Sequence, residues 1–251
     1  MNRLSQSLAL ALALSGVPLS AAVASPAPGA AAAPVVVPSD QIWSGCEVGG
    51  HVGRDAQRDE NRELFYGKPS EYAPAGPARA RGLTLGALLG CAWQSGRRVL
   101  GYELDGAYTR LSSHAEFVQP LAAGQTLHDA YDVRTPFETS VRARAGVAMG
   151  RSLSFATAGL AIAKLNYTYF QNDLDALLPY ELVARKRLGV VVGAGLDRAV
   201  SDRWRLKAEY RFTDFGTVTN LPTIYSPGFT QPHRTSEQLL RFALSYKFGD
   251  Q

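Results

Sequence analysis

The chain has 251 residues, of which 46% are hydrophobic and 19% charged, and its formal net charge at pH 7 is +4. Because the cations are spread singly along the chain, this small excess does not indicate nucleic-acid binding, and we expect no nucleic-acid partner. Two cysteines are too few for a disulfide-rich scaffold or a structural zinc site, so we expect no metal site. Composition alone leaves open one large all-β domain or two smaller ones.

Residues 1–24 have the layout of a secretory signal peptide. Arg3 precedes an apolar run over residues 8–14, and small residues at positions 22 and 24 mark a cleavage site. The run is too short to span a membrane, although an uncleaved N-terminal anchor is the alternative. Residues 25–41 are rich in Pro and Ala, which predicts an extended periplasmic linker before a folded domain over residues 42–251.

Eight segments of that domain alternate apolar and polar side chains with the period of two that defines a β-strand. In residues 204–213, Trp204 and Tyr210 lie on one face, and Arg205 and Glu209 lie on the other. Each segment has about ten residues, the length that a tilted strand needs to cross a bilayer. The segments are residues 43–53, 83–93, 100–109, 137–147, 153–167, 187–197, 204–213 and 240–248.

The connections between the segments alternate strictly between long and short. The long ones are residues 54–82, 112–134, 168–186 and 217–236, and the short ones are residues 95–98, 150–152 and 200–203. Outer-membrane barrels have short periplasmic turns and longer extracellular loops. We therefore predict an all-β fold, an eight-stranded antiparallel up-and-down transmembrane β-barrel with four long extracellular loops; a secreted soluble barrel is the alternative.

Aromatic residues cluster where the short connections lie. Membrane barrels carry girdles of aromatic side chains at both interfaces, whereas a soluble core would place Trp nearer to mid-strand. We expect a periplasmic-side aromatic girdle made of Trp43, Trp93, Trp204, Tyr246 and Phe248.

The charged faces of the strands must point inwards, because Arg or Lys facing lipid costs roughly 2 to 4 kcal/mol near the bilayer midplane. We expect a lumen ion-pair network of Glu47, Glu103, Asp105, Arg142, Arg144, Arg205, Lys207, Glu209, Arg211 and Arg241. We also expect Glu138, Lys164, Arg187, Asp197 and Lys247 in the interior. Side chains fill a lumen of eight strands, which predicts a plugged barrel, with a narrow pore as the alternative.

Several motifs resemble a known family. They are Trp43-Ser44-Gly45 followed by Gly49-Gly50, Val141-Arg142-Ala143-Arg144-Ala145-Gly146, Ala156-Thr157-Ala158-Gly159-Leu160-Ala161, and Trp204-Arg205-Leu206-Lys207-Ala208-Glu209-Tyr210. With them the chain resembles the small outer-membrane immunogenic proteins, also called porin family proteins or surface antigens, which have OmpA- and OmpX-like barrels. It departs from the pattern at Cys46 and in the three residues that follow Phe248.

The resemblance implies location in the outer membrane of a Gram-negative bacterium and a structural or adhesive, antigenic role. Expected partners are outer-membrane lipid and lipopolysaccharide, the barrel-assembly machinery, and a host or surface ligand of the loops. Some members bind haemin through exposed parts, which makes a haemin or small-ligand receptor an alternative. Since haem iron accepts His or Tyr, the candidate ligands are His114, His128, Tyr131, Tyr225 and His233.

A lipid-modifying enzyme is the remaining alternative, because such barrels need a nucleophile and a base at the outer rim. The nearest candidates are Ser113-His114 and His128-Asp129. Adjacent residues of an extended chain point to opposite sides, so we expect no enzyme. His51 is expected to face the lumen beside Glu47 as a buried polar group.

The two cysteines lie on neighbouring strands that we expect to be antiparallel. Pairing Cys46 with Cys91 also pairs Val48 with Leu89 and Val52 with Leu85, which keeps the apolar residues outward. Directly opposed Cβ atoms lie about 4.5 to 5.5 Å apart, close to what a disulfide needs. A register two residues away would instead leave two reduced cysteines, and the sequence leaves both arrangements open.

Overall fold

The computed structural model describes residues 41–62, 64–69, 77–120, 126–173, 176–220 and 229–248. The predicted signal peptide and residues 25–40 of the predicted linker lie outside these ranges. No helix among the described residues is both long and apolar enough to cross a membrane.

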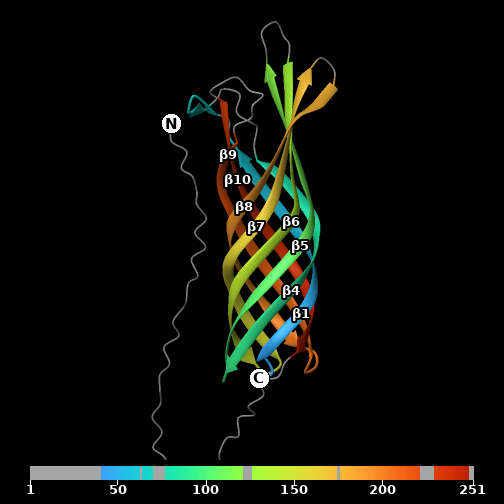
Figure 1. The fold of residues 1–251 in the computed structure, drawn as a ribbon, viewed down its shortest axis with the longest axis vertical. Coiled ribbons are helices and arrows are strands. Elements are labelled where there is room, and N and C mark those ends of the chain that lie inside the picture. The colour runs from blue at the N-terminus through green and yellow to red at the C-terminus, as the bar shows by residue number, and fades with distance from the viewer. Residues whose placement is uncertain are drawn as a thin grey trace, which may run out of the picture. The chain divides into compact units, whose positions relative to one another are not determined.

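Eight long antiparallel strands close into a ring, in which β1 pairs with both β4 and β10 (Figure 1). The strands of the ring are β1 (Gly45–Asn61), β4 (Ala78–Ser95), β5 (Arg98–Pro120), β6 (Thr126–Met149), β7 (Ser152–Asp173), β8 (Ala176–Ala199), β9 (Trp204–Asn220) and β10 (Phe229–Phe248). The short strands β2 (Leu64–Phe65) and β3 (Lys68–Pro69) form a hairpin that pairs with the start of β10. The predicted eight-stranded up-and-down barrel is confirmed.

The short connections all lie at one end of the barrel. Two of them, after β4 and after β6, are two-residue turns whose first residue is Gly96 or Gly150. Both glycines have positive φ, +58° and +59°, as tight hairpin turns require of their first position. These turns fix the pairing of β4 with β5 and of β6 with β7.

The strands are much longer than the sequence indicated, with 17 to 24 residues each. Most of the predicted long connections are strand: β5 continues to Pro120 and β6 begins at Thr126, within the connection predicted over 112–134. Figure 1 shows the β5–β6 and β7–β8 hairpins rising above the other strands. Above the bilayer the outward face need not be apolar, so the strands lose their sequence signature there although their pairing continues.

Alternation along each strand separates an apolar outside from a charged inside. The outer apolar belt consists of Val48 and Val52 on β1, Leu83, Leu85 and Leu89 on β4, Leu100, Leu104 and Tyr108 on β5, Phe137, Val141 and Val147 on β6, Leu160 and Ile162 on β7, Leu188, Val190, Val192 and Leu196 on β8, Leu206, Tyr210 and Phe212 on β9, and Leu240, Phe242 and Leu244 on β10. The register of β1 with β4 is as predicted, with Val48 opposite Leu89 and Val52 opposite Leu85.

Lys164 corrects the predicted interior. It is exposed, while Ala163 and Leu165 beside it are buried. Alternation places Lys164 on the same outward face as Leu160 and Ile162. The prediction failed because it assigned this residue by its charge rather than by its position in the strand.

Candidate functional site: the charged lumen

The lumen holds a buried network of ion pairs between opposite walls of the barrel. Arg142 on β6 donates hydrogen bonds to Asp105 on β5 and Glu209 on β9, both at 2.7 Å, and contacts Glu103. Arg241 on β10 reaches the same three carboxylates, at 3.1 Å to Asp105 and 2.7 Å to Glu209. Two guanidinium groups thus share three acids contributed by two other strands.

A second layer lies nearer the short turns and is centred on Glu47 of β1. This carboxylate accepts hydrogen bonds from Lys207 at 3.1 Å, Arg205 at 3.3 Å and Ser245 at 2.8 Å. Lys207 also contacts Glu103, which links this layer to the one above. The barrel therefore contains one continuous network over both layers.

The network contains every residue predicted for it, together with Asp197, which accepts a hydrogen bond from Arg144 at 2.6 Å. We define the lumen network as Glu47, Glu103, Asp105, Arg142, Arg144, Asp197, Arg205, Lys207, Glu209, Arg211 and Arg241. All eleven are buried. Multiple charge-assisted hydrogen bonds offset the cost of removing these buried charges from water.

Trp43 was predicted to lie in the aromatic girdle, but its side chain is only 1% exposed. Its Nε1 donates to the Gly150 carbonyl at 3.3 Å, and the Arg205 guanidinium lies 5.0 Å from the centre of its ring. Trp43 precedes β1, which begins at Gly45 with a φ of +114°. The side chain of Trp43 therefore does not follow the inward and outward alternation of that strand. It therefore packs inside the barrel at its short-turn end.

The other predicted girdle residues lie on the outer face. Trp93, Trp204 and Phe248 are exposed, and Tyr246 is half-buried beside Trp204, with ring centres 5.3 Å apart. These aromatic side chains border the apolar belt at the end where the short turns lie.

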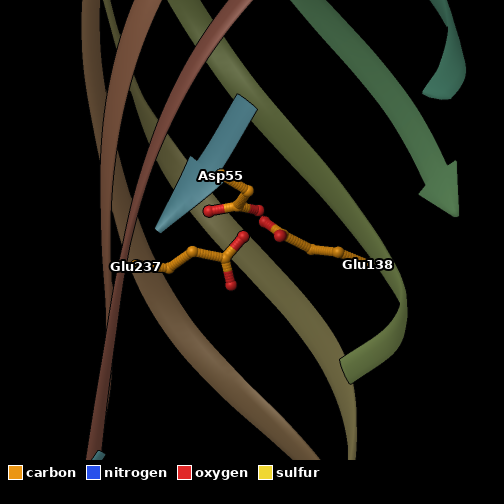
Figure 2. A group of neighbouring side chains, drawn as sticks. All are labelled: Asp55, Glu138 and Glu237. Atoms are coloured by element: carbon orange, nitrogen blue, oxygen red, sulfur yellow. The ribbon is translucent and has the colours of Figure 1, made fainter. Parts of the chain in front are cut away.

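Three further acids meet above the lumen network: Asp55 on β1, Glu138 on β6 and Glu237 on β10, here called the acid triad. Figure 2 shows their carboxylates pointing toward one another from three strands, and one oxygen of each lies within 4.8 Å of the others. All three are buried, and none forms an ion pair with a cation among the described residues. Three adjoining carboxylates need protons or a cation between them, and their oxygens are ligands that hard cations accept.

The sequence placed Glu138 inside the barrel but did not predict the triad. Asp55 fell in a predicted loop, and Glu237 lay between a predicted loop and the next predicted strand. One feature of the sequence could have indicated the inward position of Asp55. The alternation of inward polar residues continues past the apolar part of β1, through His51, Asp55, Gln57 and Asp59.

Above the triad, His233 on β10 is fully buried among aromatic residues. Its Nδ1 lies 2.7 Å from Asp59, and its ring centre lies 5.4 Å from Tyr131 and 4.9 Å from Tyr167. Thr235 donates to the other oxygen of Asp59 at 2.7 Å. This packing holds β1, β6, β7 and β10 together above the apolar belt.

Two of the five candidate haemin ligands, Tyr131 and His233, come together, and they are 1% and 0% exposed. His114 instead lies on the outer face of β5 and contacts Asp132 at 2.6 Å and Glu116 at 3.1 Å. The side chain of His128 and the whole of Tyr225 lie outside the described residues. Tyr131 and His233, closed in by their packing, do not fit an iron that must be reached from solvent.

The candidate nucleophile and base lie on opposite faces. Ser113 is 3% exposed and points into the barrel, whereas His114 points outward. The side chains of the second pair, His128 and Asp129, lie outside the description. His51 faces the lumen as predicted, but neither ring nitrogen has a hydrogen-bond partner in the part of the chain that the structure describes, so it does not pair with Glu47.

Cys46 and Cys91 lie directly opposite each other on β1 and β4, with Cα atoms 4.0 Å apart and a disulfide between them. The bond joins strands at the short-turn end, next to the layer of Glu47. It closes a sequence separation of 45 residues.

The chain is similar in sequence to known outer-membrane proteins. The 31 kDa outer-membrane immunogenic protein of Brucella melitensis is 27% identical over 86% of this chain and 88% of its own. Among solved structures, OprG of Pseudomonas aeruginosa is 12% identical, the match covers 83% of this chain and 98% of OprG, and the TM-score is 0.47. The protease OmpT of Escherichia coli is 9% identical, the match covers 82% of this chain and 97% of OmpT, and the TM-score is 0.49. The sequence model for the outer membrane protein beta-barrel domain matches residues 9–248. The chain therefore belongs to the family of outer-membrane β-barrel proteins and lies in the outer membrane.

Proposed function

We propose that this protein is a closed barrel with a structural or adhesive, antigenic role, which displays its long hairpins at the cell surface and has no catalytic site. The observation that carries the proposal is the length of the strands beyond the apolar belt. The belt ends at Tyr108 on β5, yet this strand continues to Pro120. At roughly 3.3 Å per residue, such an extension projects far from the bilayer and offers a paired, ordered surface.

The charged lumen supports a closed barrel rather than a narrow pore. Arg142 and Arg241 cross the interior and contact acids from β5 and β9, while Trp43 fills the short-turn end. An ion would have to displace buried, mutually bonded charges along this path. The name of the Brucella relative, an immunogenic protein, is in keeping with surface exposure.

Protease treatment of intact cells tests the surface display. With a protease of broad specificity, we expect cleavage between β5 and β6 and between β7 and β8, whereas the short turns at Arg97 and Arg151 should be cut only after the cells are opened. Cleavage at these two arginines in intact cells, or recovery of the protein from the soluble periplasm, would contradict the proposal.

The absence of catalysis needs a separate measurement. Lipid A from cells with and without the protein should have the same mass spectrum. A modified lipid A that appears only when the protein is expressed would favour the lipid-modifying enzyme. Titrating haemin against refolded protein tests the receptor alternative, and a saturable shift of the haem absorption band would favour it.

A further inference from the structure

A set of exposed basic residues follows the upper edge of the apolar belt. On six neighbouring strands of the ring, the next exposed residue above the belt is basic. We call these residues the basic arc: Arg54 on β1, Arg81 on β4, Arg110 on β5, Arg134 on β6, Lys164 on β7 and Lys186 on β8. On β9 and β10 the corresponding residues are Asp214 and Gln238. The arc therefore covers one side of the barrel and leaves the β9–β10 side without it.

Only one residue of the arc has an acidic partner among the described residues. Arg134 lies 3.7 Å from Asp132, and the other five residues form no ion pair with any acid that the structure describes. Lys164 and Lys186 lie directly opposite each other on β7 and β8. Like charges at directly opposed positions destabilise a sheet unless an anion neutralises them. On the β9–β10 side, in contrast, Arg234 pairs with Asp214 at 2.9 Å.

The position of the arc selects the class of anion. Arg110 directly follows Tyr108 on the outward face of β5, and Lys186 directly precedes Leu188 on that of β8. A ligand that bridges these positions needs acyl chains for the belt and negative groups for the arc. Guanidinium groups bind phosphate through paired hydrogen bonds, and interfacial clusters of Arg and Lys bind anionic lipid headgroups. A free phosphate would gain nothing from the belt.

We propose that the basic arc binds the phosphate groups of lipopolysaccharide in the outer leaflet, along the side of the barrel formed by β1 and β4 to β8. The acyl chains lie against the apolar belt, and the phosphates lie between neighbouring cations such as Lys164 and Lys186. The protein thus holds its lipid on one side, while the β9–β10 side binds it more weakly.

The test compares two triple variants that remove the same charge. Arg110→Gln/Lys164→Gln/Lys186→Gln removes half of the arc, and Arg98→Gln/Arg198→Gln/Arg203→Gln removes three exposed cations at the short-turn end. Binding of purified bis-phosphorylated lipid A to the folded protein in neutral detergent is measured by native mass spectrometry. At about fivefold per cation, the arc variant should bind on the order of a hundredfold more weakly, and the control variant like the wild type.

Two further arms identify the ligand chemistry. In the first arm, dephosphorylated lipid A binds the wild type, and its affinity should be about as low as that of phosphorylated lipid A for the arc variant. In the second arm, millimolar inorganic phosphate should not displace phosphorylated lipid A from the wild type. Equal losses in the two triple variants, tight binding of dephosphorylated lipid, or displacement by phosphate would each overturn the proposal. Should the triple variant fail to fold, Arg54→Gln/Arg81→Gln provides the same test, with an expected loss of roughly twentyfold.

Discussion

The lumen network and the acid triad lie in the same lumen but differ in charge compensation. In the network, six cations face five carboxylates, and Arg142 alone reaches three of them. In the triad, Asp55, Glu138 and Glu237 face one another without a cation partner among the described residues. The difference indicates that the part of the lumen within the apolar belt is built for permanent charge, whereas the triad needs protons or a bound cation to remain buried.

Removing the central cation should break the compensated region most severely. Arg142→Ala leaves Glu103, Asp105 and Glu209 in a buried site with one guanidinium fewer, and we expect a loss of about 3 to 5 kcal/mol in the free energy of unfolding. Urea titration in lipid vesicles, followed by the heat-modifiable gel mobility, measures it. The exposed Arg198→Ala is the control, and equal losses for both variants would refute the importance of the network.

The disulfide is a second source of stability at the end where the network lies. Replacing Cys46 and Cys91 by Ser should lower the free energy of unfolding by up to about 4 kcal/mol, the chain-entropy value for a closed loop of 45 residues. Mass spectrometry of protein alkylated without reduction should find no modified thiol in protein from the cell envelope. Two alkylated cysteines would contradict the bond.

One substitution made in both regions sharpens the comparison. Glu209→Gln removes an acid that contacts Arg142 and Arg241 and should destabilise the protein, whereas Glu237→Gln removes a group that needs a proton or a shared cation to stay buried beside the other two acids, and should stabilise it. Charges less than 5 Å apart at an effective dielectric constant near 20 suggest changes of about 1 to 3 kcal/mol in each direction. The same urea titration measures both. Destabilisation by Glu237→Gln as large as that by Glu209→Gln would show that the triad is already compensated.

The smallest effect is expected in the β5–β6 hairpin, outside the barrel. The hydrogen bond to Asp132, helped by Glu116, raises the pKa of His114 above its ordinary value of 6.5. Because the pKa of His114 is higher in the folded state than in the unfolded state, this contact stabilises the protein fully below pH 6.5. The stabilisation is lost as the pH rises through the folded-state pKa. Because His114 is half exposed, solvent screening limits the effect to a few tenths of a kcal/mol. An NMR titration of the imidazole should show the raised pKa, and Asp132→Asn should lower it toward 6.5, because only the contact with Glu116 then remains.

The sequence predicted the barrel and the members of the lumen network because both follow from alternation. Once the outward face is apolar, Glu47, Arg142 and Glu209 can only point inwards. It could not predict which acid contacts which cation, because these contacts cross between β1, β6 and β9 and depend on the stagger of the closed ring. Trp43 and the acid triad were missed for a related reason. Trp43, Asp55 and Glu237 lie beyond the ends of the apolar segments, where lipid no longer requires a particular pattern; Glu138 was placed inside the barrel, but its two partners were not.

Ion conduction tests the central claim, a lumen closed by its own compensated charges, most directly. Purified protein is inserted into planar bilayers, and current is recorded over a range of voltages with the folded monomer verified by gel mobility. We predict no steady open channel for the wild type, because Arg142, Arg241 and their acids cross the path. A reproducible, ohmic single-channel current from the wild-type monomer would contradict the closed lumen and make the protein a narrow pore.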